Sequence, residues 1–204
     1  HIWFARIGDG SLGGKARGLA FLNNLVYKHR LSEQYPNIKV SIPRTVVIAT
    51  DYFDQFILEN DLQYVIDSEI SDDEVLSEFV SSRLPEDLVD QLRVFIETAR
   101  SPLAVRSSSK LEDSSYQPFA GVYSTYMIPL VENKDQMLRM LGKAIKSVYA
   151  SVFYGSSRTY IHTTANLLSE EKMAVVVQSI CGSEHNGFYY PMVSGVGRSV
   201  NYYP

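Results

Sequence analysis

Three consecutive residues, Gly13-Gly14-Lys15, combine two unhindered backbone positions with a positive charge. Apolar residues then recur at helical spacing, which predicts a helix from Gly14 to about Arg30. The first N–H groups of a helix favour anions, so this segment could bind one. A flexible glycine lead-in followed by a solvated lysine is the alternative interpretation. A P-loop is disfavoured because Asp9 and Ala16 stand where it needs a glycine and a hydroxyl residue.

A second basic residue, Arg106, follows a short apolar run that begins at Leu103. We expect a buried strand to end at Arg106 and a polar loop to cover residues 107–121. A guanidinium at a strand end can hold phosphate oxygens through two parallel hydrogen bonds, and Ser107-Ser108 could add further donors. Alternatively, Arg106 pairs with Glu112-Asp113 and pins the loop.

Composition and charge bound the classes of function. The 204 residues are 45% hydrophobic with a formal net charge of −4, so we expect no general basic surface for nucleic acid. The single cysteine, Cys181, cannot form an internal disulfide and fits a reducing, cytoplasmic setting. No stretch approaches the roughly 20 apolar residues of a membrane span. His29, His162 and His185 lack the spacing of metal ligands, so we expect no metal ligand within this chain.

Strands and helices are expected to alternate irregularly, which indicates an α+β or mixed α/β domain. Ser71-Asp72-Asp73-Glu74 is a capping-box sequence, and Thr50 or Asp51 could cap the helix that begins at Tyr52. The expected strands cover residues 45–49, 103–106, 123–128, 173–178 and 188–200, and the expected helices cover 14–30, 52–59, 71–82, 85–99, 134–154 and 156–166.

Several segments, taken in order, resemble the nucleotide-binding domain of the phosphoenolpyruvate synthase and pyruvate phosphate dikinase family. The matching stretches are Gly13-Gly14-Lys15, Ile42-Pro43 with Thr45 to Thr50, Ala104-Val105-Arg106-Ser107-Ser108, Glu112-Asp113, Phe119-Ala120-Gly121, Thr125-Tyr126, Ala174 to Gln178 and Ser194-Gly195-Val196. The resemblance implies an ATP-grasp-like α+β fold in which this chain is the N-terminal part and the second lobe is truncated. Residues 1 to about 100 would form an N-terminal α/β part, and about 101–204 would form an ATP-grasp lobe.

The resemblance also implies roles for individual residues. Lys15 and Arg106 match the family's catalytic, phosphate-contacting lysine and arginine, and the segment from Gln178 to Ile180 matches the one near adenine. The residues expected to contact ATP are Gly13, Gly14, Lys15, Arg106, Ser107, Ser108, Ala120, Gly121, Gln178, Ser179 and Ile180. Mg²⁺ is expected as a cofactor, with its ligands outside this chain.

The function that the resemblance implies is one part of a larger ATP-dependent phosphotransferase. ATP would phosphorylate a histidine on another domain of the parent chain, and the phosphoryl group would pass to pyruvate on a further domain. By itself the chain is expected to be inactive. The family loop usually continues after Phe-Ala-Gly with glutamines and an acidic residue, whereas Val122-Tyr123-Ser124 follows here. A non-catalytic nucleotide-binding or regulatory module of the same fold is therefore the alternative.

Overall fold

The computed structural model describes residues 3–35, 37–109, 123–163, 172–197 and 199–200. The strands are β1 Phe4–Ile7, β2 Thr45–Ile48, β3 Leu103–Ser109, β4 Thr125–Ile128, β5 Met173–Ser179, β6 Ser183–His185 and β7 Phe188–Tyr190. The helices are α1 Gly13–Lys28, α2 Leu31–Gln34, α3 Thr50–Glu59, α4 Tyr64–Asp67, α5 Asp72–Ser81, α6 Glu86–Glu97, α7 Lys134–Ala150 and α8 Gly155–Thr163, with a 3-10 turn, η1, at Ser151–Phe153. The expected α+β character is confirmed.

Five strands form a mixed sheet in the order β1-β2-β5-β3-β4. The β1–β2 pair is parallel, and the other neighbouring pairs are antiparallel. β5 lies at the centre and pairs with β3 along its whole length, from Met173 opposite Ser109 to Ser179 opposite Leu103. Its unbroken apolar run fits this position, because a central strand covered on both faces has no solvent side.

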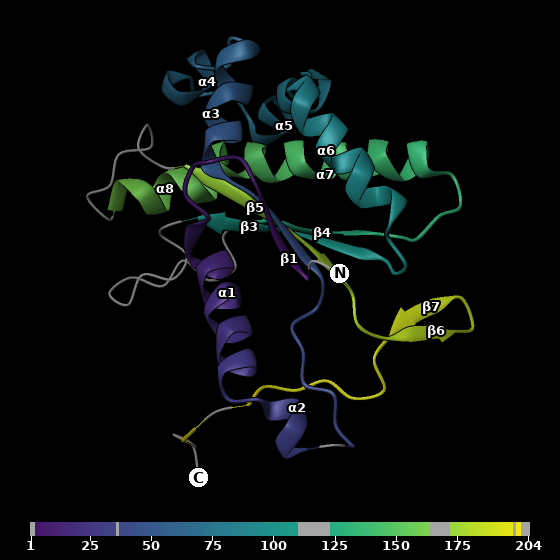
Figure 1. Ribbon diagram of the computed structural model, residues 1–204. Helices are drawn as coiled ribbons and strands as arrows, with labels where there is room; N and C mark the ends of the chain where they lie inside the picture. Colours follow the sequence, from purple (N-terminus) through teal and green to yellow (C-terminus); the bar gives the residue numbers. More distant parts are fainter. Residues whose placement is uncertain (1–2, 36, 110–122, 164–171, 198, 201–204) are drawn as a thin grey trace.

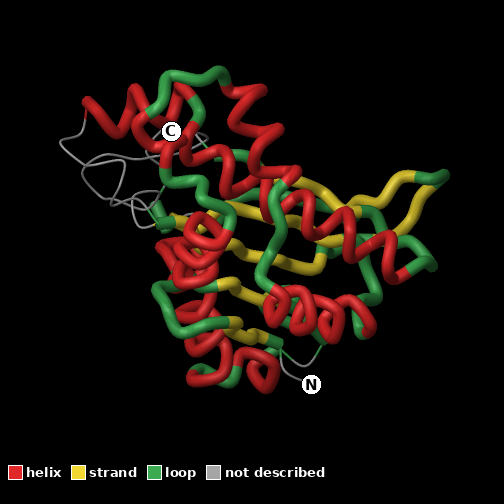
Figure 2. Tube along the Cα trace, turned by 90° about the horizontal axis from the view of Figure 1, so that it is seen from above, coloured by secondary structure: helices red, strands yellow, loops and turns green. Residues whose placement is uncertain are grey.

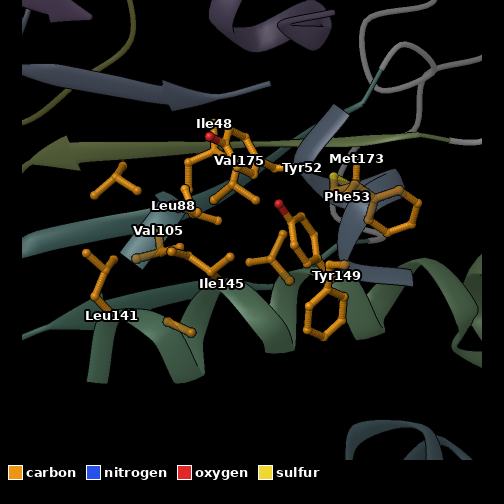
Figure 3. Packing of buried hydrophobic residues seen from close by; sticks show 14 of the residues in the cluster. Ile48, Tyr52, Phe53, Leu88, Val105, Leu141, Ile145, Tyr149, Met173 and Val175 are labelled. Atoms are coloured by element: carbon orange, nitrogen blue, oxygen red, sulfur yellow. The ribbon is translucent and has the colours of Figure 1, made fainter. Parts of the chain in front are cut away.

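Helices cover the two faces of the sheet unequally (Figure 1). On one face, α7 packs across the sheet together with α3, α5 and α6, and most of the buried side chains lie there. Val105 and Val175 of the sheet meet Leu141, Ile145 and Tyr149 of α7 in this larger core (Figure 3). On the other face, among the described residues, α1 packs over a small cluster formed by Ala16, Val47 and Val176. The hydrophobic core is therefore larger on the face covered by α7 than on the face covered by α1.

The strand that carries Arg106 is longer than expected. β3 continues to Ser109, and Ser107 to Ser109 are buried, so the loop expected to begin at residue 107 is wrong over these residues. The remaining loop residues, 110–121, lie outside the described part of the chain. Pairing with β5 accounts for the difference, since Ser107, Ser108 and Ser109 each lie opposite a residue of β5, and strand formation depends on such neighbours more than on local sequence. Arg106 consequently lies within a strand and not at its end.

The C-terminal strand is shorter than expected. β6 and β7 form a two-stranded hairpin that extends away from the sheet (Figures 1 and 2), and β7 ends at Tyr190. The strand expected over residues 188–200 is therefore wrong beyond Tyr190. Asn186 and Gly187 both have positive φ, at 52° and 84°, and an Asn-Gly pair is the preferred sequence of a type I′ hairpin turn.

Helix starts agree with the sequence in one case and differ in another. At α5, Ser71 and Glu74 form the expected capping box, in which each side chain binds the other residue's backbone N–H. At α3, Ala49 occupies the N-cap position, so the expected cap by Thr50 or Asp51 is wrong. Both side chains instead accept hydrogen bonds from the segment that precedes α1. No helix in the described ranges combines the length and the apolarity needed to cross a bilayer.

Candidate functional site

The N-terminus of α1 lies directly on β3. Gly13 has a φ of 71°, and a Cβ atom added there would lie 1.8 Å from the carbonyl oxygen of Ser108. An L side chain would therefore meet both backbone strain and a collision with a buried strand. Gly13 is required because it lets the start of the helix approach β3 closely.

The hydroxyl of Ser108 fixes this approach. It is fully buried, accepts a hydrogen bond from the Ala16 N–H at 3.1 Å and donates to the Leu12 carbonyl at 2.8 Å. These are the two backbone groups, four residues apart, that close the first turn of an α-helix. The hydroxyl thus bridges the first turn of α1 and ties it to β3.

Lys15 extends from this first turn toward β3. Its ammonium group, Nζ, lies 3.2 Å from the carbonyl oxygen of Ser107 and 3.3 Å from the hydroxyl of the same residue. The register between β3 and β4 ends at Arg106, so Ser107 lies on the part of β3 that extends past β4. The side chain of Lys15 is half-buried there, beside the residue that follows Arg106.

Arg106 shares a face of the sheet with the contacts of α1. It pairs with Val176 of β5 and is half-buried. Side chains alternate between the faces of a strand, so Arg106 points to the same side as Ser108, two residues further on. That side is the one covered by α1, where Val176 packs in the smaller cluster. The structure therefore brings Gly13-Gly14-Lys15, Arg106 and Ser107-Ser108 into one neighbourhood.

The segment before α1 is joined to the start of α3 by hydrogen bonds. The Asp9 N–H donates to the Asp51 carboxylate at 2.8 Å, and the Ser11 N–H donates to the Thr50 hydroxyl at 2.9 Å. The Thr50 N–H in turn donates to the Ser11 carbonyl at 3.0 Å. The start of α3 thereby anchors the loop that leads into Lys15.

Burial and hydrogen bonding act in opposite directions on Asp51. Burial raises the pKa of its carboxyl group, while backbone N–H groups close to it, first among them that of Asp9, lower it. The net result is a pKa below the ordinary value of 3.8. Asp51 is therefore charged at neutral pH, and its charge is bound to the loop before α1.

The segment expected near adenine lies further along the same two strands. The Gln178 amide donates to the Thr45 hydroxyl at 3.0 Å. The N–H groups of Ser179 and Ile180 already donate, at 2.9 Å each, to the carbonyls of Arg44 and Pro102. A ligand could use these N–H groups only after breaking existing bonds.

The expected site residues consequently fall into two groups along β3. Gln178 lies opposite Ala104, four residues from Ser108. At the rise of an extended strand this separates the two groups by roughly 13 Å. Both groups lie on the same pair of strands, β3 and β5.

Other expected site residues cannot be placed. Ala120 and Gly121 lie outside the described residues, and so do Glu112 and Asp113, the expected partners of Arg106. Among the described residues, no group of three His, Cys, Asp or Glu side chains is arranged to hold a metal ion.

Sequence reasoning missed the residues that position the site. Thr50 and Asp51 were expected as caps of their own helix, and Ser108 was expected as a phosphate donor in a loop, whereas its buried hydroxyl bonds to the backbone of α1. A local signal for Asp51 existed, because an acidic residue in the first turn can bind any nearby N–H groups and not only its own helix. No local signal could reveal Ser108, whose partners are 92 and 96 residues away.

Comparisons with known proteins relate this chain to one family and to a bacterial phosphotransferase. The family described as "Pyruvate phosphate dikinase, AMP/ATP-binding domain" matches residues 9–203. The chain is also 31% identical over 149 residues to a Bacillus subtilis (strain 168) protein described as "Uncharacterized phosphotransferase YvkC". That match covers 73% of this chain and spans only 17% of the length of the relative. Because this match covers nearly the whole chain, the chain belongs to the family of pyruvate phosphate dikinase AMP/ATP-binding domains.

Proposed function

We propose that this chain supplies one wall of an ATP site in which Lys15 and Arg106 hold the phosphates. Family membership supports the binding of ATP. The observation that carries the proposal is the contact from Lys15 Nζ to the Ser107 carbonyl at 3.2 Å. It joins residues 92 positions apart and brings the lysine beside the strand that carries Arg106.

The proposed roles follow from the charges of the two side chains. Phosphoryl transfer is accelerated mainly by positioning and by charges already in place around the transferring oxygens. Arg106 can offer two parallel N–H donors to one phosphate, and Lys15 can act as a compact point charge. Ser108 and Gly13 contribute indirectly, because they fix the first turn of α1 from which Lys15 extends.

We further propose an acceptor and a wider architecture. ATP phosphorylates a histidine on another domain of a longer protein, and pyruvate is the final acceptor, as the resemblance to dikinases implies. The fold is the N-terminal part of an ATP-grasp, with an N-terminal part up to about residue 100, and a second lobe supplies the Mg²⁺ ligands. Ala120-Gly121 lies over the phosphates, and Gln178 to Ile180 lie near adenine. The name of the Bacillus relative, a phosphotransferase, supports group transfer in general.

A second candidate is a nucleotide-binding or regulatory module that has lost transfer. The observation that favours it is Tyr123, which stands where the resemblance leads us to expect a polar loop. Its side chain is 7% exposed and packs in the larger core. A side chain directed into the core cannot contact a nucleotide. The side chain of Tyr123 therefore contributes to packing of the core.

The test uses the protein that contains this chain together with its neighbouring domains. Arg106→Ala should slow formation of phosphohistidine, followed by ³¹P NMR, by roughly 10²–10³-fold. Lys15→Gln should also slow it strongly. Lys28→Gln is the matched control, because it removes the same charge from the exposed far end of α1 and should leave the rate unchanged.

Two outcomes would overturn parts of the proposal. A well-folded Arg106→Ala protein with a near-normal rate would exclude the proposed role of Arg106. A wild-type protein that binds ATP but never forms phosphohistidine would favour the regulatory module over the enzyme. Unfolding curves of each variant separate loss of activity from loss of structure.

A further inference from the structure

A groove with a volume of about 680 Å³ lies between α5, α6 and α7. Its apolar lining includes Leu84, Val89, Leu92 and Leu138. These helices cover the face of the sheet opposite α1 (Figure 1), so the groove is separated from Lys15 by the sheet. The volume falls within the range of about 300–1,000 Å³ that small-molecule sites occupy.

The charge of this groove is opposite to that of the chain. Five of its fourteen lining residues are basic and one is acidic, which gives a local balance of +4. The whole chain has a formal net charge of −4. The concentration of positive charge around an apolar floor favours ligands that carry a negative charge.

The basic residues of the groove differ in whether they already have partners. Arg93 pairs with Asp135 at 2.7 Å, and Lys146 donates to the carbonyls of Val80 and Ser82 at the end of α5. The side chains of Arg93 and Lys146 therefore already have partners within the protein.

Three other basic residues line the groove, and their side chains have no such partners among the described residues. The side chains of Arg83, Arg139 and Lys143 are exposed, and within the described residues none has a hydrogen-bond or ion-pair partner. Arg139 and Lys143 are four residues apart on α7, so both lie on one face of the helix. Three uncommitted cations thus surround an apolar floor.

Gly142 keeps the groove open. It lies within α7, where glycine destabilises a helix by about 1 kcal/mol relative to alanine. A Cβ atom added there would meet only Leu84 Cδ1, at the ordinary contact distance of 3.5 Å. Close packing therefore does not require glycine at this position, and what the missing side chain provides is space in the groove.

We propose that this groove binds a small organic anion with an apolar body, whose phosphate or carboxylate head lies among Arg83, Arg139 and Lys143. The apolar body rests on Leu84 and Leu138. The site goes beyond the proposed ATP site, because it lies on the other face of the sheet and uses none of its residues.

Octyl phosphate is a suitable probe, titrated into the ¹⁵N-labelled 204-residue chain and followed by amide chemical shifts. We expect saturable shifts centred on Leu84, Val89 and Gly142. Inorganic phosphate lacks the apolar body and octyltrimethylammonium carries the opposite charge, so both should bind at least about tenfold more weakly. Octanoate compares a carboxylate head with a phosphate head on a similar body.

Matched variants test the basic residues and the apolar floor of the groove separately. The double variant Arg139→Gln, Lys143→Gln should weaken octyl phosphate binding at least about tenfold, since each side chain offers a charge-assisted contact. Lys28→Gln with Lys39→Gln removes the same charge at exposed positions away from the groove and should leave the affinity unchanged. Gly142→Leu should abolish binding by filling the floor.

The proposal fails if octyltrimethylammonium binds as tightly as octyl phosphate, or if the shifts centre on the β6–β7 hairpin. It fails equally if the double variant retains wild-type affinity. The glutamine variants are exposed and should fold, so the test does not depend on the more disruptive change at Gly142. ATP binding measured on the double variant should be unchanged, which keeps this result independent of the proposed function.

Discussion

Gly13 and Gly142 both lie in helices, but their surroundings differ. At Gly13 a methyl group would collide with the Ser108 carbonyl, and the backbone has a φ of 71°. At Gly142 it would make an ordinary contact with Leu84. The same substitution therefore has opposite consequences at the two positions.

We expect Gly13→Ala to lower the free energy of unfolding by about 2–4 kcal/mol, because strain and collision add. Gly142→Ala should raise it by about 0.5–1 kcal/mol, because alanine is the better helix former. Urea unfolding followed by circular dichroism measures both. A stable Gly13→Ala protein would mean that α1 can move away from β3 at little cost.

Among individual residues, the charged candidates could be predicted from the sequence, but the residues that hold them in position could not. Lys15 and Arg106 stand out because their side chains suit anions and follow glycines or an apolar run. Ser108 carries no comparable signal, since a serine that bridges a helix turn has the same local sequence as a serine in a loop. Its role depends on partners that only the fold brings near.

The contact between α3 and the loop before α1 predicts a dependence of stability on pH. The pKa of Asp51 is lowered in the folded protein, because backbone N–H groups of the loop and of the start of α3 together outweigh the effect of burial. Its charged form is thus favoured by folding. The contribution is complete above the unfolded value, near 3.8, and is lost as pH falls through the lower folded value.

We therefore expect Asp51→Asn to destabilise the protein at pH 6 and to converge toward the wild type as pH falls below about 4. Denaturant unfolding of both proteins between pH 6 and pH 2.5 measures the difference. A constant difference across this range would show that the carboxylate charge does not hold the loop. Glu59→Gln on the exposed end of α3 is a suitable control.

Element boundaries show where sequence patterns were sufficient. Helices with a strong apolar face, such as α7, were placed closely, because their burial pattern is local. β3 was underestimated because its last three residues are polar and owe their strand conformation to β5. The hairpin of β6 and β7 was overlooked although Asn186-Gly187 is a recognised turn sequence, since the apolar run after it was read as one strand.

For the whole molecule, the proposed architecture sets a limit on what the chain does by itself. An ATP-grasp site needs two lobes, and the Mg²⁺ ligands are proposed to lie on the second. Each 1.4 kcal/mol of lost interaction weakens binding about tenfold, so the absence of one wall should cost several decades of affinity. We expect weak ATP binding and no turnover from the 204-residue chain in isothermal titration calorimetry with Mg²⁺. Sub-micromolar affinity under these conditions would place the complete site within this chain.

The division of the chain at about residue 100 remains a prediction. β1 and β2 come from before that point, β3, β4 and β5 come after it, and all of them share a sheet. The long-range pairing of these strands could not be read from the sequence, because alternation reveals that a strand exists but not which strand lies beside it.

The central position of β5 has a consequence for the order in which the protein forms. β5 joins β2 to β3, yet it is the last strand of the sheet to be synthesised. Until β5 is available, nothing in the sheet connects β2 to β3, because these two strands are not neighbours. Only when residues up to Ser179 have emerged can β5 enter between them and unite both halves of the core. Closing such distant pairs is entropically costly, so we expect the sheet to be completed only after the segment up to Ser179 is available.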